Sequence, residues 1–459
     1  MYPSRYNSEK EMIRFFSFEF ISENEVYDNV NWNNKSSEIE ADGVIYAVIP
    51  EDKEGLIKLK KLLLKTSEDC NRCIFIIPRK FIHIENTIKE FSAVLQLRDE
   101  AVGDDVLFDE YQAVYEDLRD VINSYISFYT HPEKESSNYI FCGEEKNISR
   151  KSEMTELMSD ICNDIFTMTP VINNEVINQN YPTATAVNSR NKVVAGLLRN
   201  QLEDNLGLTG TGQDVSIMRS TLLRTGVLIN ENGIAQISLN PANDMMRNLL
   251  NTISDFIKES RHVESVSFKT LYDYLTLPEY NIGLRKGVIP IYLAAVLHEY
   301  RQNIIVKDKN GQLQLSSDLL LQINSNPSKF ELQYIAWDND KEAFIDNLEV
   351  IFGEYIVDAE KRLNSYDYAV AAMKRWYMSL SKYAKETKTL PNGKKLDKRY
   401  LNFVSSLKRE TGTYDFLFKE LPSDVGYSQG FALVMVKYIN TGKAFYDGLL
   451  YELKKYLID

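Results

Sequence analysis

Cysteine and histidine are scarce in this sequence. Each occurs four times in 459 residues, and the histidines (His83, His131, His262 and His298) show no metal-ligand spacing. So few cysteines exclude a disulfide framework. Cys70 and Cys73 form a lone C-N-R-C pair, whereas a zinc site would need a second pair of ligands. Because Cys73 opens the strand-like run CIFIIP, we interpret the thiols as buried apolar groups.

Long apolar runs and targeting signals are also missing. No run approaches the roughly 20 residues that a membrane-spanning helix needs. The opening residues, MYPSRYNSEKEMIRFF, lack a basic segment followed by an apolar core, so they do not resemble a secretory signal. We therefore expect a cytoplasmic protein. The 44% of hydrophobic residues indicates a globular chain rather than a disordered one.

Recognisable catalytic and phosphate-binding motifs do not occur. The chain has no G-x-x-x-x-G-K-[ST] loop, no G-x-G-x-x-G turn after its first strands, no G-x-S-x-G elbow and no H-E-x-x-H. We predict no catalytic residue, cofactor or metal for this chain. An enzyme with an unrecognised site stays open as an alternative.

The pattern of elements predicts a mainly α, multidomain chain with a small α/β part at the N-terminus. The runs GVIYAVI and CIFIIP read as buried strands, and each is followed by a helical pattern. Residues 104–130 predict a long amphipathic helix, with Asp104 and Asp105 at its positive end. We expect four domains: 1–130 (α/β with the long helix), 131–262 (helical), 263–338 (winged-helix module) and 339–459 (helix bundle).

Short signals give three local predictions. The stretch TPVINNEVINQN, residues 169–180, predicts a helix with Thr169 as N-cap and Pro170 as its first residue. We interpret it as structural rather than as a binding site. Asn232-Gly233 and Asn310-Gly311 each predict a two-residue type I′ hairpin turn.

Residues 263–338 have the helix, helix, hairpin order of a winged-helix module. Its second helix, GVIPIYLAAVLHEY, offers only His298 and Glu299 as polar head groups besides tyrosine hydroxyls. A helix that reads DNA exposes Arg, Asn, Gln or Lys along one face. We therefore favour protein docking over DNA contact for this module. The flanking basic residues that could touch phosphate are Arg285, Lys286, Lys307 and Lys309.

Positive charge is concentrated near the C-terminus of an acidic chain. The net charge is −13, yet residues 360–459 hold 18 basic and 11 acidic residues. Trp376, Tyr377, Tyr383 and Tyr400 are interleaved with the basic residues, a combination that suits a phosphate backbone with stackable bases. The alternative is the outer face of a helix bundle whose aromatic residues point inward. The candidate nucleic-acid-binding residues are Lys374, Arg375, Lys382, Lys385, Lys388, Lys394, Lys395, Lys398 and Arg399.

Several segments together resemble a known kind of protein. They are TPVINNEVINQN, NIGLRKGVIPIYLAAVL, NPSKFELQYI, RWYMSLSKYAKETKTL and FLFKELPSDVG. They are similar to the middle and C-terminal parts of large multidomain bacterial P-loop ATPases of genome-defence (anti-phage) gene clusters, over roughly residues 40–425. The resemblance implies a P-loop domain N-terminal to the matching region. This chain carries no such loop, so no catalytic residue is transferred to it.

These observations lead to one expected function and two alternatives. We expect a non-catalytic scaffold or sensor portion of a bacterial, ATP-dependent anti-phage defence assembly. Its partners would be protein subunits, with DNA or RNA as a further partner at the Lys374–Tyr400 surface, and no membrane. The alternatives are a free-standing winged-helix regulator that binds nucleic acid, and the enzyme with an unrecognised site.

Overall fold

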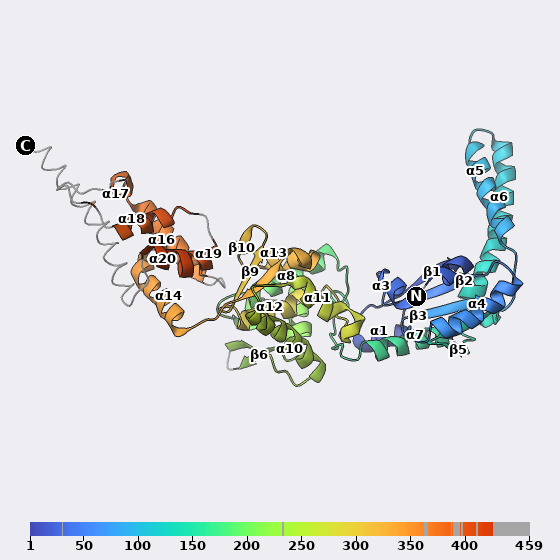
Figure 1. Cartoon of the computed structure of the whole chain (residues 1–459), viewed down its shortest axis with the longest axis horizontal. Coiled ribbons are helices and arrows are strands. Elements are labelled where there is room, and N and C mark those ends of the chain that lie inside the picture. Colours follow the sequence, from blue (N-terminus) through green and yellow to red (C-terminus); the bar gives the residue numbers. More distant parts are fainter. Residues whose placement is uncertain are drawn as a thin grey trace, which may run out of the picture. The chain divides into compact units, whose positions relative to one another are not determined.

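We describe the protein from a computed structural model of the whole chain (Figure 1). The structure describes residues 1–29, 31–231, 234–361, 366–386, 388, 395, 398–409 and 412–425. By its internal contacts the chain divides into two compact units, Met1–Thr167 and Met168–Asp459. Helices predominate and the sheets are small, so the prediction of a mainly α chain with an α/β N-terminal part is confirmed. The finer division into four domains stays a prediction.

The first unit is built on a five-stranded mixed sheet. Its strands lie in chain order, with β1, β2 and β3 parallel and β4 and β5 antiparallel to their neighbours. The expected strand–helix–strand unit is confirmed, because helix α4 connects β2 to the adjacent parallel strand β3. The sheet continues beyond residue 130 through β4 and β5. The strands are β1 (Phe16–Ser22), β2 (Gly43–Ile49), β3 (Cys73–Pro78), β4 (Ser137–Phe141) and β5 (Glu144–Lys146).

Helices cover both faces of this sheet. Alternate residues of β2 and β3 enter two separate hydrophobic clusters: Ile45 and Ile74 pack with helices α1 and α7, whereas Tyr46 and Phe75 pack with α3 and α4. Both faces are therefore buried, which explains the continuous apolar runs. The helices of this unit are α1 (Ser4–Lys10), α2 (Glu23–Asp28), α3 (Trp32–Ser37), α4 (Lys53–Thr66), α5 (Glu85–Glu100), α6 (Asp105–Thr130), η1 (Pro132–Lys134) and α7 (Lys151–Ile165).

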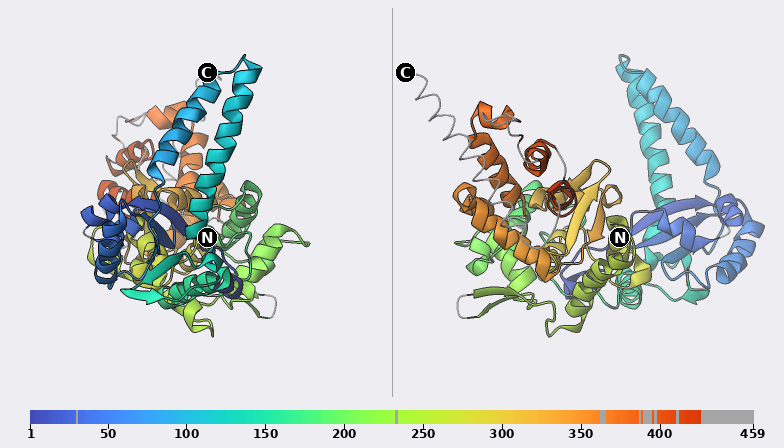
Figure 2. Two further views of the ribbon diagram at one scale, coloured as in Figure 1. Left: turned by 90° about the vertical axis from the view of Figure 1, so that its right-hand side faces the viewer. Right: turned by 60° about the vertical axis from the view of Figure 1, so that its left-hand side comes forward.

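Helices α5 and α6 form a long hairpin that extends away from the sheet (Figure 2). The predicted long helix is confirmed, and its start is fixed by Asp104, whose carboxylate accepts a hydrogen bond from the Leu107 amide at 3.2 Å. The rings of Phe91 in α5 and Tyr115 in α6 stack between the two helices, with their centroids 5.0 Å apart.

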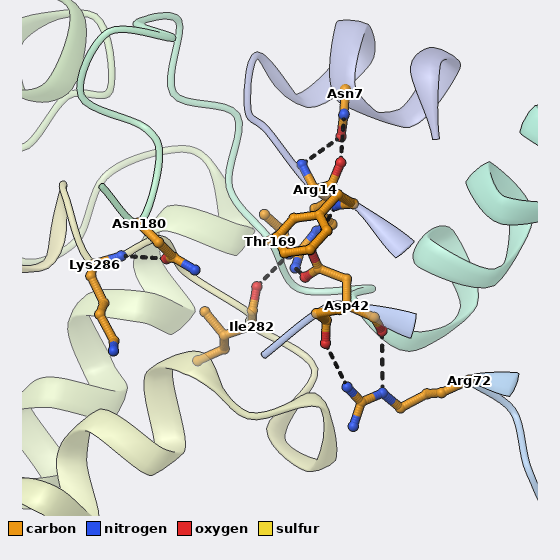
Figure 3. Close-up of polar contacts among 10 residues, drawn as sticks. Asn7, Arg14, Asp42, Arg72, Thr169, Asn180, Ile282 and Lys286 are labelled. Atoms are coloured by element: carbon orange, nitrogen blue, oxygen red, sulfur yellow. Dashed lines mark hydrogen bonds and ion pairs between the residues drawn. The ribbon is translucent and has the colours of Figure 1, made fainter. Parts of the chain in front are cut away.

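A buried ion pair anchors the N-terminus to the sheet of the first unit (Figure 3). The Arg14 guanidinium lies 2.6 Å from the Asp42 carboxylate, and both side chains are buried. The Phe166 ring lies 3.4 Å from the centre of that guanidinium. Burial is the largest single influence on the pKa of Arg14 and would lower it. The charge of Asp42 and the hydrogen bond to it, together with the nearby Tyr6 and Cys162 side chains, outweigh burial and raise that pKa, so the guanidinium stays charged.

In the second unit, residues from Ile172 to Leu332 share one hydrophobic core. The core includes α8, α10, α11, α12 and the four-stranded sheet of order β10-β9-β11-β8. The helices here are α8 (Ala184–Leu197), η2 (Asp204–Gly207), α9 (Gln213–Met218), η3 (Arg219–Leu223), α10 (Asp244–Glu259), η4 (Ser260–His262), α11 (Phe268–Thr276), η5 (Pro278–Tyr280), α12 (Ile289–Glu299), α13 (Ser317–Ser325) and η6 (Pro327–Lys329). The strands are β6 (Leu228–Glu231), β7 (Ile234–Ile237), β8 (Val266–Ser267), β9 (Ile304–Asp308), β10 (Gly311–Leu313) and β11 (Glu331–Tyr334).

The predicted helix at 169–180 is wrong: this segment is an irregular loop. Thr169 does not cap a helix, because its hydroxyl donates to the Ile282 carbonyl (Figure 3). The Asn174 amide donates to the Ser220 hydroxyl at 2.9 Å, and the Asn178 amide to the Ile172 carbonyl at 3.4 Å. The Asn178 bond is of the local kind that competes with helix formation, whereas the Thr169 and Asn174 bonds tie the segment to residues far away in the sequence. We call residues 169–180 the asparagine loop.

The asparagine loop packs against residues 281–288, which are the start of the second segment quoted for the resemblance. The Gly287 amide donates to the Gln179 carbonyl at 3.0 Å, and the Lys286 amide donates to the Asn180 side chain at 3.1 Å (Figure 3). A Cβ on Gly287 would lie 2.0 Å from the Ile177 carbonyl oxygen. Only glycine allows this approach.

The two predicted hairpins are present, and one turn differs from the prediction. Strands β6 and β7 pair, but Asn232-Gly233 lies outside the described residues. In the second hairpin Asp308 pairs with Gly311, so the two-residue turn is Lys309-Asn310 instead of Asn310-Gly311. Gly311 has a φ of +129°, whereas Asn310 is not among the residues with positive φ. The turn is therefore not type I′, which needs positive φ at both central residues.

After β11 the described chain is a cluster of helices with its own hydrophobic core around Trp376, Phe352 and Phe403. No helix in the described part of the chain has both the length and the apolar character needed to cross a membrane. The helices of this cluster are α14 (Asn339–Phe352), η7 (Gly353–Tyr355), α15 (Asp358–Lys361), α16 (Asp367–Ser379), α17 (Lys382–Glu386), α18 (Lys398–Ser406), α19 (Thr413–Asp415), η8 (Phe416–Glu420) and α20 (Leu421–Val425).

Candidate functional site

The candidate basic residues belong to three helices and the segments between them. Lys374 and Arg375 are in α16, Lys382 and Lys385 are in α17, and Lys398 begins α18. Lys394 and the side chain of Arg399 lie outside the described residues. The exposed members are Lys374, Lys382, Lys388, Lys395 and Lys398.

Arg375 and Lys385 have structural partners within the helical cluster. The Arg375 guanidinium donates to the Tyr355 carbonyl at 2.7 Å and forms an ion pair with Glu360. The Lys385 ammonium donates to the Met378 carbonyl at 2.9 Å and lies 5.3 Å from the centre of the Tyr377 ring. These two side chains connect α16 and α17 to their surroundings, which leaves the exposed lysines as the candidates for phosphate contact.

The aromatic residues in this region do not all face outward. Trp376 is completely buried, 5.9 Å from the Phe352 ring and 5.7 Å from the Phe403 ring. Leu380 is also buried, as the alternative interpretation of an inner face expected. The side chains of Tyr383 and Tyr400 lie outside the described residues. Trp376 is therefore a core residue and cannot stack on a base.

Helix α12, the second helix of the expected winged-helix module, is buried along its whole length from Ile289 to His298. Its Tyr292 hydroxyl donates to the Thr221 carbonyl at 3.0 Å, inside the protein. Of the flanking basic residues, Arg285 is buried and Lys307 lies 3.9 Å from Glu331. The helix therefore presents no face that could enter a DNA groove.

His298 is a core residue. Burial, helped by the nearby Arg301 charge and opposed by a hydrogen bond to the Leu197 backbone, lowers its pKa to about 4. The ring is therefore neutral near pH 7. Cys70 and Cys73 are likewise buried, as predicted. Within the described residues no group of three or more His, Cys, Asp or Glu side chains could hold a metal ion.

Sequence reasoning missed a cavity of about 330 Å³ beside the asparagine loop. We call it the α10 cavity, because the N-terminal end of α10 forms one wall. Val171 and Asn173 of the asparagine loop form another wall, and the end of η3 with the following residues forms a third. The polar residues of the loop could have suggested a site, but the helix prediction favoured a structural role for the segment.

A second cavity, of about 250 Å³, lies between the β9–β10 hairpin and the helical cluster. Its lining includes Arg301, Trp337 and Tyr366, and the last two rings are stacked with centroids 5.0 Å apart. Gln312 of β10 and the Thr413 end of α19 also line it, together with aliphatic side chains such as Val306 and Leu315. The lining is therefore mixed, and the stacked rings already cover one face of each other.

Comparisons with known proteins do not identify the chain. No family model, no characterised protein and no solved structure matches it. Its residues and geometry are what remain to indicate a function.

Proposed function

We propose that this chain is a non-catalytic scaffold or sensor portion of a bacterial, ATP-dependent anti-phage defence assembly, and that it works by contacting protein subunits in the cytoplasm. The resemblance of five segments to the non-P-loop parts of such ATPases supports the assembly. Two of these segments pack against each other, through Gly287 and the asparagine loop. This packing supports a structural role for the residues that carry the resemblance.

We also propose that residues 263–338 form a winged-helix module used for packing, and that the helices from 339 onward form a bundle. The order of α11, α12 and the β9–β10 hairpin within these residues supports the module. Strand β11 departs from the simplest arrangement, since it pairs with both β8 and β9. The observation that carries the proposal is the burial of α12, because a helix without an exposed polar face cannot read base edges.

Contact with nucleic acid is a second candidate function, at the basic surface only. It is supported by five exposed lysines between Lys374 and Lys398. Lysines that touch phosphates bind without sequence preference, and the affinity falls steeply with salt.

A selection from a pool of randomised DNA duplexes tests the proposal. The full chain is incubated with the pool at about 150 mM salt, and the retained duplexes are sequenced. We expect no enriched motif, because α12 offers no side chains to the bases. Enrichment of one motif that Lys307→Glu and Lys309→Glu remove would instead identify a free-standing winged-helix regulator.

A further inference from the structure

The α10 cavity has a buried floor and an exposed rim. Ser220 and Met246 form the floor and are buried, while Val171, Asn173 and Arg224 on the rim are exposed. The cavity is therefore open to solvent and deep enough to enclose part of a ligand. Ligand sites in proteins commonly combine apolar surface with a few polar groups.

A π-helical turn places Arg224 at this rim. The Arg224 amide donates to the Arg219 carbonyl, five residues back, at 2.9 Å. Such turns are rare and occur often at functional sites. Arg219 and Arg224 are both exposed, and neither forms an ion pair with any residue that the structure describes. Only Arg224 lines the cavity. A cation without a carboxylate partner is thus available to a ligand there.

The remaining lining defines what kind of ligand fits. The side chains of Asn173, Thr225 and Asn243 add polar groups to the lining, although the Thr225 hydroxyl already donates to the Thr221 carbonyl and the Asn243 side chain accepts from the Met246 amide. Val171, Leu223 and Met246 offer aliphatic surface. Among the residues that the structure describes, no aromatic side chain lines the cavity, although nucleobases are usually held by stacking on aromatic rings. The lining matches a polypeptide, which brings backbone amides, aliphatic side chains and, where acidic, a carboxylate.

We propose that the α10 cavity binds a short acidic segment of a protein partner, with a Glu or Asp carboxylate on Arg224 and a neighbouring aliphatic side chain on Leu223 and Met246. Charge-assisted bonds from arginine to carboxylate are among the stronger polar contacts in proteins. This inference rests on the proposed scaffold function and names the chemistry of the partner's binding segment.

Peptide binding to the full chain tests the proposal. The probe is a fluorescein-labelled, capped pentapeptide of sequence Gly-Leu-Glu-Leu-Gly, and its comparison peptides carry Gln or Lys in place of Glu. Fluorescence anisotropy at low salt should show the Glu peptide binding at least about tenfold more tightly than either comparison peptide. Equal affinities for the three peptides would overturn the proposal. So would the absence of Glu-peptide binding at a protein concentration of about 1 mM.

Matched variants locate the site. Arg224→Glu should abolish the preference for the Glu peptide, whereas Arg219→Glu, an equally exposed change on the same π-helical turn but outside the cavity, should retain it. Likewise Val171→Glu should weaken binding, and Val176→Glu, which is exposed on the same loop but does not line the cavity, should not. The same loss in both members of a pair would overturn the assignment to this cavity.

Two further outcomes separate the cavity from neighbouring explanations. Displacement of the peptide by inorganic phosphate at equal concentration would mean that Arg224 binds anions in general, and would overturn the peptide proposal. If the chain forms a complex with a partner protein that Arg224→Glu leaves intact, and no peptide binds, the cavity proposal fails while the scaffold function stands. If the chain binds the Glu peptide selectively but forms no complex with a partner protein, the cavity proposal stands while the scaffold function fails.

Discussion

At the scale of single residues, two positions carry unusual constraints. Gly287 lies where a side chain would strike the backbone of the asparagine loop, and His298 is a titratable ring that is buried. Neither constraint is visible from the sequence alone. A glycine between lysine and valine looks like any loop glycine, and its role depends on a segment more than a hundred residues away.

Gly287→Ala should destabilise the second unit. The added Cβ would meet the Ile177 and Gln179 carbonyl oxygens at 2.0 and 2.6 Å, both of them backbone atoms that cannot move away alone. Overpacking of this kind costs about 1–3 kcal/mol. Urea unfolding followed by circular dichroism measures the loss. The control is Gly353→Ala, where nothing lies within 4 Å of the added Cβ. Equal stability of the two variants would contradict the packing described here.

His298 should make the second unit less stable in mild acid. Burial lowers its folded-state pKa to about 4, below the unfolded value of about 6.5. Between these values the unfolded chain binds a proton that the folded chain does not. The stability that this histidine contributes is therefore complete above pH 6.5 and is lost as the pH falls toward 4, by about 2 kcal/mol at pH 5.

Comparison of His298→Gln with His262→Gln isolates this effect from the carboxylates. His262 is exposed, so its replacement should leave the difference in unfolding free energy between pH 7 and pH 5 unchanged. His298→Gln should reduce that difference. A His298→Gln protein with the wild-type pH dependence would show that the ring titrates normally.

At the scale of elements, local signals predicted some structures and long-range contacts decided others. Helix α6 was predictable, because its apolar spacing and its Asp104 cap lie within the helix itself. The asparagine loop was not, because Thr169 bonds to Ile282 and Asn174 to Ser220, neither of which is near in sequence. Likewise Trp376 could be assigned to an inner face from its spacing, whereas the α10 cavity required three distant segments to be placed together.

Asp104→Ala should loosen the start of α6. The change removes the acceptor of the Leu107 amide, and loss of such a cap typically costs about 1 kcal/mol. Hydrogen exchange of the first turns of α6 should then accelerate roughly fivefold. The control is Asp109→Ala, an exposed change within the same helix that removes no cap. Unchanged exchange after Asp104→Ala would show that another group holds this end.

At the scale of the whole molecule, the distribution of charge and the burial of α12 limit where nucleic acid could bind. The chain is acidic overall, whereas residues 360–459 hold more basic than acidic residues and include exposed lysines. The helix that a winged-helix protein would place in DNA is inside the core. Contact with nucleic acid is therefore expected only at the basic surface, and contact with proteins elsewhere.

Replacing Lys374, Lys388, Lys395 and Lys398 by glutamate should remove whatever affinity the chain has for DNA. The wild-type affinity should fall steeply between 50 and about 200 mM salt, because it depends on neutralised phosphates. Arg375 is left unchanged because it holds the helical cluster together. The control carries the same charge change at four other exposed lysines, Lys151, Lys258, Lys269 and Lys329. An equal loss of DNA affinity in both variants would show that the affinity depends on the total charge of the chain and not on the basic surface.

The mass of the complexes that the chain forms is the best test of whether it acts through protein subunits. The full chain is co-expressed with each protein encoded beside its gene, and the purified species is measured by size-exclusion chromatography with light scattering. We predict a stable complex of defined stoichiometry that contains a P-loop ATPase and survives the four lysine-to-glutamate changes. A chain that stays free of every neighbouring protein while it binds one DNA sequence at physiological salt would contradict action through protein subunits.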